Sequence, residues 1–504
     1  MIYLFAVALG AALPLSLAPF DWWPFGLVSI AGWFWLLTNS GGPAVTTRKS
    51  GSRRALMLGW TYGVGLFGTG VSWVYVSINV YGRASPALAA FLVAMFVAGM
   101  AVFPMVQAWF YTRLKGRGWL MNVLWFAAVW FAFEWLLTWF LTGFPWLYPG
   151  YAHLTTPLAG FAPVGGVSLV GLMAVLSACA LVAAVGSRQR IRSVALALLP
   201  WVVGGALQSI EWVTPVGTRS VALVQGNVPQ RVKWQPGRAA GIIRGYLDLT
   251  EPHWGVDVVV WPEAAVTLFE HQAGDVLAHL DERGKAAGSS VLLGMPTLIR
   301  TPDARTRIFN SALATGMGEG RYHKRRLVPF GDYVPLQGVF GEVMELFDLP
   351  LSSASAGDWV QAPLRLDDLS AALAICYEVV YAGLVRNSAR DADVLVTISN
   401  DTWFGSSIGP FQHMQIARMR ALENGRWMLR ATNNGITAIV DHSGAVTGSL
   451  PQFEQGVLTG EFRVMQGHTL FNRWGDGYLV ALCLLLLAVR LALRVTGGGE
   501  SGHA

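Results

Sequence analysis

Eight apolar stretches, each close to the length that crosses a lipid bilayer, constrain this 504-residue chain more than any other feature. A helix needs about 20 apolar residues to cross the hydrocarbon core. The stretches cover residues 2–20, 22–38, 55–77, 86–111, 119–140, 161–186, 194–210 and 477–494. With 53% hydrophobic and 13% charged residues, the composition is that of a membrane protein with a soluble part. We predict a seven-span bundle over 1–214, a soluble domain over 215–470, and a last span with a short tail over 471–504.

Basic residues before residue 215 gather in alternate loops between these stretches. The loops contain Arg48, Lys49, Arg53 and Arg54; then Arg113, Lys115 and Arg117; then Arg188, Arg190 and Arg192. Arg83 is the only basic residue in any other loop. The positive-inside rule makes the three basic loops cytoplasmic. Both termini are therefore predicted to be cytoplasmic, and the soluble domain is predicted to lie on the opposite side of the membrane.

Two other interpretations of these segments are not favoured. The net charge of +6 is explained by the basic loops, so it does not indicate nucleic-acid binding. The first apolar stretch lacks a basic start and a small-residue cleavage signature, so we interpret it as a retained span.

After Thr218 the long apolar stretches give way to shorter runs that are typical of strands. Short β-branched runs at 221–224, 256–261, 291–293, 369–376, 394–398 and 436–440 are separated by Gly, Pro and Asn, with helical patterns at 239–249 and 413–423. Strands that alternate with helices predict an α/β layered domain with a largely buried sheet.

Three features that resemble functional motifs have simpler explanations. The GxGxxG match at 63–68 lies inside a predicted span, where small residues allow close helix packing. The nine histidines show no metal-ligand spacing. Glu134 is costly in hydrocarbon, so it pairs within the bundle or serves a function; we favour the first.

Three reactive residues lie beside β-like runs of the soluble domain. Glu263 follows 256–260, Lys324 precedes 327–331, and Cys376 ends 369–376 as the only cysteine outside an apolar stretch. Sites in α/β domains collect at the carboxyl ends of strands. A thiol nucleophile needs a proton acceptor and a cation beside the oxyanion of its adduct, roles that Glu263 and Lys324 can fill. Taken one at a time, Cys376 could be a core residue, Glu263 could lie in a solvated turn, and Lys324 could belong to a basic surface. Only the combination of the three residues favours a site.

Six motifs carry a family resemblance, namely residues 143–146, 225–230, 261–263, 322–331, 376–378 and 400–405. They resemble the nitrilase superfamily, which uses a Glu-Lys-Cys triad on an α-β-β-α sandwich. Over its full length the chain resembles the apolipoprotein N-acyltransferase family of the bacterial inner membrane. The resemblance implies that Glu263 is the general base, that Lys324 stabilises tetrahedral intermediates, and that Cys376 carries an acyl group as a thioester.

The same resemblance implies supporting residues. Tyr377 and Glu378 would support the nucleophile, and Trp234 and Trp403 would lie near the substrate. Asp332 stands where the family usually has glutamate, and Leu137 stands where many relatives have arginine.

The implied reaction transfers an acyl chain from the sn-1 position of a phospholipid such as phosphatidylethanolamine. The acceptor would be the α-amine of the N-terminal S-diacylglyceryl cysteine of an apolipoprotein. No metal or other cofactor is implied, because a thioester stores the acyl potential. The soluble domain would then lie in the periplasm.

Two segments are candidates for contact with lipid. An apolar helical stripe of Val339, Phe340, Val343, Leu346 and Phe347 predicts either a mobile lid over the site or a helix packed on the domain core. The aromatic loop 143–151, which contains Trp146, either lines the lipid entrance or lies at the interface as aromatic residues ordinarily do.

Two other functions remain as alternatives. A membrane-tethered amidase or nitrilase would pass the acyl group to water, although eight spans exceed what such an enzyme needs. A noncatalytic scaffold would retain the fold without needing Glu263, Lys324 and Cys376.

Overall fold

The computed structural model describes residues 1–39, 48–116, 118–186, 189–300, 306–329, 331–333 and 354–497. The predicted lid at 339–347 lies outside these residues. The chain forms two compact units. The helical unit comprises Met1–Val74, Ala87–Glu211 and Trp474–Ala504, and the second unit comprises Tyr75–Pro86 and Trp212–Arg473.

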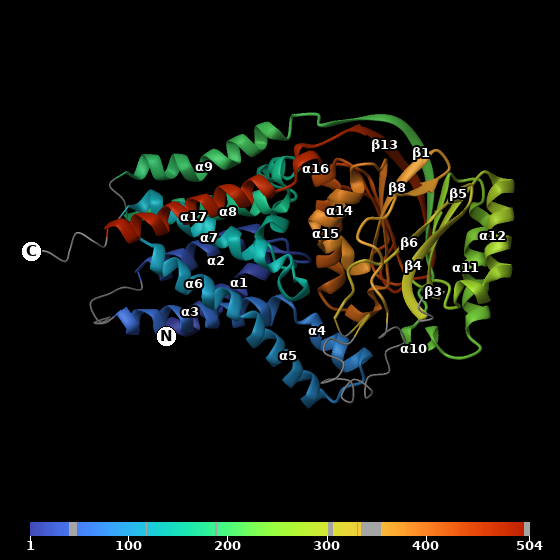
Figure 1. Ribbon diagram of the computed structural model, residues 1–504, viewed down its shortest axis with the longest axis horizontal. Coiled ribbons are helices and arrows are strands. Elements are labelled where there is room, and N and C mark those ends of the chain that lie inside the picture. The colour runs from blue at the N-terminus through green and yellow to red at the C-terminus, as the bar shows by residue number, and fades with distance from the viewer. Residues whose placement is uncertain are drawn as a thin grey trace, which may run out of the picture. The chain divides into compact units, whose positions relative to one another are not determined.

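Each of the eight apolar stretches contains a helix in the described chain. These helices are α1 (Ile2–Ala12), α2 (Trp23–Asn39), α3 (Arg48–Gly70), α4 (Trp73–Val76), α5 (Pro86–Met100), α6 (Val102–Leu114), α7 (Trp119–Leu137), α8 (Ala162–Gly186), α9 (Arg190–Leu207) and α17 (Gly477–Gly497) (Figure 1). The short helix α16 (Leu470–Trp474) precedes the last of them.

Four helical segments of the described residues are long and apolar enough to cross a membrane. They are Pro86–Leu114, Trp119–Leu137, Pro157–Val185 and Arg190–Leu207. The pair Gly51–Gly70 and Trp73–Tyr81, bent by 57°, is a fifth candidate, while Ile2–Ser16 and Gly477–Ala492 are apolar but shorter. The protein is a membrane protein; the full count of eight spans stays a prediction.

The glycines of the GxGxxG match pack helices against one another, as expected from their place in a span. A Cβ on Gly65 of α3 would lie 2.1 Å from the carbonyl oxygen of Val7 in α1. A Cβ on Gly63 would lie 2.6 Å from Cα of Ala101, which precedes α6. Contacts this close require glycine, so the motif serves helix packing in this unit.

The second unit contains two β-sheets. The six-stranded sheet has the order β13-β1-β2-β3-β4-β6, and the seven-stranded sheet has the order β12-β11-β10-β9-β8-β7-β5. The first contains β1 (Val213–Gln225), β2 (Val258–Val260), β3 (Ser290–Arg300), β4 (Thr306–Gly316), β6 (Arg321–His323) and β13 (Gly456–Gly467). The second contains β5 (Gly318–Glu319), β7 (Leu364–Leu366), β8 (Leu369–Ile375), β9 (Val394–Ser399), β10 (Met428–Thr432), β11 (Ala438–Val440) and β12 (Val446–Ser449).

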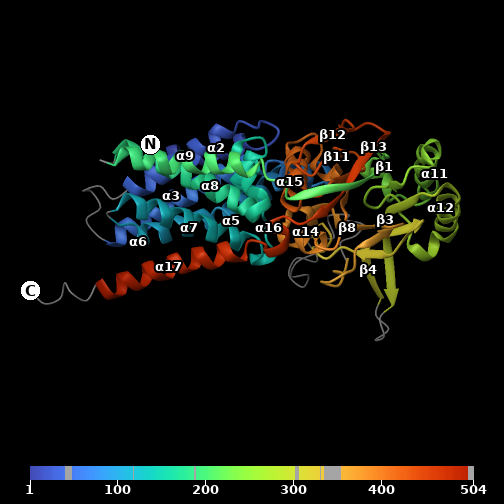
Figure 2. The ribbon, with the colours of Figure 1, turned by 90° about the horizontal axis from the view of Figure 1, so that it is seen from above.

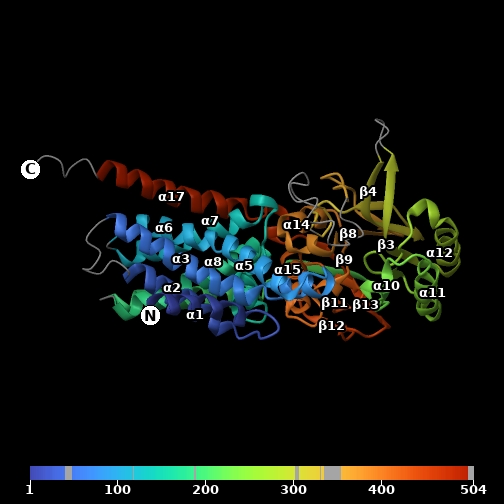
Figure 3. The same cartoon turned by 90° about the horizontal axis from the view of Figure 1, so that it is seen from below.

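Helices cover the outer face of each sheet. α11 (Ala239–Thr250) and α12 (Gly274–Ala287) lie on the six-stranded sheet, and α14 (Ala382–Ala389) and α15 (Gly409–Asn424) lie on the seven-stranded sheet. Figure 2 and Figure 3 show these helix layers on opposite sides of the paired sheets.

Alternating side chains build two apolar cores around these layers. Leu223, Val260, Leu373 and Ile398 belong to one buried cluster that both sheets share, whereas Val224 faces α11 in a second cluster. Strand side chains alternate between faces, so β1, β2, β3 and β4 of the six-stranded sheet serve both cores. The unit is thus the predicted α-β-β-α sandwich.

Residues 75–86 belong to the sandwich unit, which the uninterrupted apolar stretch 55–77 did not indicate. The hydroxyl of Ser77 donates to the carbonyl of Trp403 at 2.8 Å, and the Tyr81 and Trp403 rings lie 6.1 Å apart. A Cβ on Gly405, whose φ is +53°, would meet the Val76 side chain at 2.9 Å. The segment therefore packs on the loop that follows β9.

Candidate active site

Glu263 follows β2, and its carboxylate is almost fully buried. Oε1 accepts a hydrogen bond from Nδ2 of Asn310 at 2.7 Å, and Oε2 accepts one from the backbone N–H of Asn400 at 2.8 Å. A carboxylate offers about four acceptor positions. These contacts fix the carboxylate and leave room for it to accept a further proton.

Lys324 follows β6 and is 1% exposed. Its Nζ lies 2.8 Å from Oδ2 of Asp332 and 3.5 Å from Oε1 of Glu263. Burial opposes the ammonium charge, but the two carboxylates outweigh it and raise the pKa of Lys324. The side chain is therefore a permanent cation and can stabilise an oxyanion.

Asp332 reaches Lys324 despite the short side chain that distinguishes it from glutamate. Its Oδ2 also accepts a hydrogen bond from the backbone N–H of Val328 at 2.8 Å. A turn in which the N–H groups of Gly331 and Asp332 donate to the Val328 carbonyl carries Asp332 inward. The turn therefore brings the shorter side chain of Asp332 to Lys324, a distance that glutamate would cover with one more methylene.

Cys376 begins a 3₁₀ turn, Cys376–Val380, directly after β8. Its φ of +53° is in the left-handed region, which an L residue occupies only under strain. Burial and the carboxylate of Glu263 raise the pKa of the Cys376 thiol, and the ammonium of Lys324 lowers it in part. The structure thus brings the three predicted residues together, and the resting thiol is neutral, so a nucleophilic role would require a base.

Glu378 forms hydrogen bonds to residues at the ends of both β6 and β8. Its Oε2 accepts from the Tyr322 hydroxyl at 2.9 Å and from the Ile375 N–H at 2.8 Å. Its Oε1 accepts from the N–H groups of Arg325 at 2.7 Å and Arg326 at 3.1 Å. Burial raises the pKa of Glu378, although these N–H donors favour its charged form. The carboxyl connects the residues beside Lys324 with those beside Cys376.

The predicted aromatic residues occupy different surroundings. Trp234 ends α10 (Gln230–Lys233), Trp403 lies in the turn Asp401–Phe404, and both keep some exposed surface. Tyr377 is buried, with its ring edge-on to Tyr381 at 5.5 Å. Trp146 belongs to the helical unit, where it is 1% exposed against Trp73 and Phe144. Only Trp234 and Trp403 are therefore placed in the sandwich unit with surface to offer a substrate.

Glu134 in α7 is buried in the helical unit. Its Oε1 accepts from the indole N–H of Trp130 at 2.7 Å, and its backbone carbonyl accepts from the Tyr148 hydroxyl at 2.5 Å. The carboxyl therefore pairs within the bundle, as favoured from the sequence.

The sequence did not single out three polar residues around Glu263. Asn310 and Asn400 bind the carboxylate, and the buried ammonium of Lys233 donates to the backbone carbonyl of Glu263 at 3.0 Å. Burial lowers the pKa of Lys233 to about 8. Asn400 lies in a motif that was noted, and Lys233 precedes Trp234, but Asn310 lies in the middle of β4 without any local signal.

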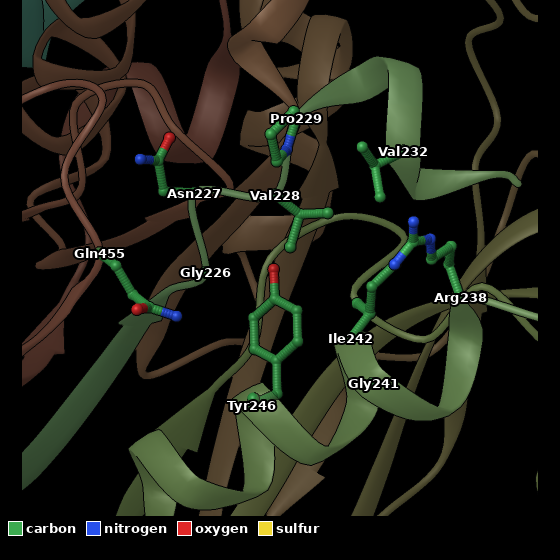
Figure 4. A pocket seen from close by; sticks show the side chains of 11 residues that line it. Gly226, Asn227, Val228, Pro229, Val232, Arg238, Gly241, Ile242, Tyr246 and Gln455 are labelled. Atoms are coloured by element: carbon green, nitrogen blue, oxygen red, sulfur yellow. The ribbon is translucent and has the colours of Figure 1, made fainter.

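A cavity of about 300 Å³ lies between α11 and the loop after β1. Figure 4 shows Ile242 and Tyr246 of α11, and Arg238 directly before this helix, facing Val228 and Pro229 of that loop. Glu263, Lys324 and Cys376 do not line it. The reactive residues are therefore separate from this cavity.

The paired sheets and the strand-end residues define a domain of the carbon–nitrogen hydrolase class, and residues 220–466 match the family model described as carbon-nitrogen hydrolase. Residues 9–180 match the model of the apolipoprotein N-acyltransferase N-terminal domain. An apolipoprotein N-acyltransferase from Pseudomonas syringae pv. tomato is 43% identical over 98% of this chain and 97% of its own length. Another from Pseudomonas paraeruginosa is 44% identical over 96% of this chain and 94% of its own. The chain therefore belongs to the apolipoprotein N-acyltransferase family.

Among solved structures, a CN-hydrolase superfamily protein from Xanthomonas campestris is 19% identical, with a TM-score of 0.36. The match covers 49% of this chain and 91% of that protein.

Proposed function

We propose that this protein transfers an acyl chain from a phospholipid to an apolipoprotein through a thioester on Cys376. The donor is the sn-1 ester of a phospholipid such as phosphatidylethanolamine, and the acceptor is the α-amine of an N-terminal S-diacylglyceryl cysteine. The observation that carries the proposal is the convergence of a fixed carboxylate, Glu263, and a permanent cation, Lys324, on the neutral thiol of Cys376. Membership of the acyltransferase family supports the choice of substrates.

In the first half-reaction Glu263 takes the thiol proton as the Cys376 sulfur attacks the ester carbonyl. Lys324 stabilises the oxyanion of the tetrahedral intermediate. The C–O bond breaks, the protonated Glu263 returns the proton to the leaving oxygen, and a lysophospholipid departs. A thioester on Cys376 remains.

In the second half-reaction the acceptor amine, in its neutral form, attacks the thioester carbonyl. Glu263 takes a proton from the attacking nitrogen, and the C–S bond breaks to give the amide. The proton then returns to the Cys376 sulfur. This ping-pong sequence restores the resting thiol and consumes no metal ion or nucleotide.

The first test is mass spectrometry of the purified protein after incubation with phosphatidylethanolamine labelled in its sn-1 chain. We expect a labelled acyl adduct on the Cys376 peptide, removed by hydroxylamine and absent from Cys376→Ala. Cys179→Ala is the matched control and should keep the adduct, because Cys179 is buried in the helical unit. A diacylated lipopeptide should discharge the adduct and become triacylated.

Two outcomes would contradict the proposal. An adduct that water discharges as fast as the lipopeptide amine does would identify a hydrolase. A folded protein that never forms the adduct would leave Cys376 without its proposed role.

We further propose that residues 215–470 lie in the periplasm of a bacterial inner membrane and that both termini are cytoplasmic. The basic loops of the helical unit support this topology. A cysteine introduced at Asp275, an exposed position of α12, should react with a membrane-impermeant maleimide in intact spheroplasts. A cysteine at Arg190 should react only after lysis, and the reverse pattern would invert the topology.

A further inference from the structure

A buried polar cluster lies behind Cys376 and has no part in the steps given above. It consists of Ser399, Asp401, His413 and Arg430, each at most 2% exposed. These residues come from the end of β9, the turn after it, α15 and β10. His413 bonds the backbone carbonyl of Cys376 and Ser399 lies beside its thiol, so the cluster is in a position to control the nucleophile.

Asp401 is the charged centre of this cluster. Oδ2 pairs with Nη2 of Arg430 at 2.6 Å, and Oδ1 accepts from the Ser399 hydroxyl at 2.6 Å. Burial works against the charge of this carboxylate, but the Arg430 guanidinium and the hydrogen bonds that the carboxylate accepts together outweigh it and lower the pKa of Asp401. The carboxylate is thus ionised and accepts the single proton of Ser399.

His413 holds the backbone of the nucleophile. Its Nε2 lies 3.2 Å from the carbonyl oxygen of Cys376, which can only accept, so Nε2 carries a hydrogen. Its Nδ1 lies 3.1 Å from Nη2 of Arg430, which can only donate, and 3.1 Å from Oδ1 of Asp401, which can only accept. Burial and Arg430 lower the pKa of His413, which favours the neutral ring; with the hydrogen on Nε2, Nδ1 of that ring accepts from Arg430. This bond helps to retain the left-handed backbone of Cys376.

Ser399 faces two acceptors with one hydrogen. Its hydroxyl donates to Asp401. Cys376 and Ser399 directly follow the paired residues Ile375 and Ile398 of β8 and β9, which brings the Cys376 thiol beside the same hydroxyl. While Cys376 is a thiol, its S–H can donate to the Ser399 oxygen. Once Glu263 removes that proton, the sulfur becomes an acceptor and a thiolate binds a donor strongly.

We propose that Ser399 is a positioning residue whose hydroxyl turns from Asp401 to the Cys376 sulfur when the thiolate forms. The thiol proton goes to Glu263, and the Ser399 proton stays on its oxygen and changes only its acceptor. Asp401 holds the hydroxyl ready and, with Arg430, fixes His413 on the Cys376 carbonyl. The inference rests on the proposed role of Cys376 as nucleophile.

The test is the pH dependence of alkylation of Cys376 by iodoacetamide, read by mass spectrometry of its peptide in the full-length protein. This readout requires no acyl transfer, so it is independent of the proposed function. Ser399 lowers the pKa of the thiol and Asp401 raises it. Thiolate forms as pH rises, so Ser399→Ala should move the alkylation midpoint to higher pH and Asp401→Asn should move it to lower pH.

The size of the effect follows from the loss of a hydrogen bond to an anion. At pH 8, Ser399→Ala should slow alkylation about 10- to 100-fold and lower kcat for acyl transfer similarly, with KM for the donor unchanged. Ser399→Thr keeps the hydroxyl and should stay within about 3-fold of the wild type. Thr397→Val is the matched control, since its hydroxyl is buried on the same strand without a hydrogen-bond partner among the described residues.

Two results would overturn the inference. One is a Ser399→Ala profile that matches Thr397→Val. The other is a shift of Ser399→Ala and Asp401→Asn in the same direction, which would indicate that both simply loosen the site. Loss of the acyl adduct with the opposed shifts intact would contradict the proposed function and leave the role of Ser399 standing.

Discussion

Replacing Lys324 by methionine should abolish acyl transfer and lower the free energy of unfolding of the sandwich unit by about 3–5 kcal/mol. Lys324 is the cation between Asp332 and Glu263, at 2.8 and 3.5 Å from their oxygens. Methionine fills a similar volume but leaves two buried carboxylates without their counterion, and it removes the charge that would stabilise the oxyanion. Thermal unfolding in detergent and formation of the Cys376 adduct measure the two losses.

A second substitution separates the charge effect from packing. Lys324→Met combined with Asp332→Asn should be more stable than Lys324→Met alone, because one of the two uncompensated charges is gone. Lys285→Met is the matched control: Lys285 also pairs with a carboxylate, Asp281, at 2.8 Å, but on the surface, where ion pairs contribute little. A Lys324→Met protein as stable as the Lys285→Met protein would contradict the view that Lys324 is a counterion in the fold.

The sequence predicted the three candidate catalytic residues better than it predicted the residues that bind and orient them. Glu263 and Cys376 were found because strand ends are readable from β-branched runs, and each does follow a strand. Lys324 was placed before a run at 327–331, whereas in the structure it follows β6. Asp332 could not be judged, since its contact with Lys324 depends on a turn at Val328 that side-chain length does not reveal.

Long-range contacts account for what was missed. Asn310 binds Glu263 across 47 positions of the sequence, and Asn400 does so across 137. Asn310 meets Glu263 when β2, β3 and β4 assemble into one sheet, whereas Asn400 meets it only when the two sheets pack. Residues 75–86 join the sandwich unit for a similar reason: their contacts with Trp403 and Gly405 lie over 300 residues away, beyond the reach of hydropathy.

Replacing Glu263 by glutamine should lower kcat/KM for acyl transfer about 10²- to 10⁴-fold, the usual contribution of a general base, and should leave the unfolding temperature nearly unchanged. The amide oxygen can still accept from the N–H of Asn400. The new NH₂ group would face Asn310, whose own amide can turn to present its oxygen. Lys324 keeps Asp332 as its counterion. Steady-state transfer to a diacylated lipopeptide gives the rate, with Glu319→Gln on the exposed edge of β5 as the control.

Glu263→Gln also distinguishes two roles of Glu263: proton transfer as a general base, and the effect of its charge on the pKa of the Cys376 thiol. The charge of Glu263 raises the pKa of the Cys376 thiol, so Glu263→Gln should make the thiolate easier to form and should speed alkylation of Cys376 near neutral pH. If acyl transfer needed only a thiolate, the variant would therefore be the faster enzyme. A general base must also take the proton of the attacking amine and return one to the leaving oxygen, and glutamine can do neither. Faster alkylation together with slower acyl transfer is thus the expected pair of results, and acceleration of both would assign proton transfer to another group.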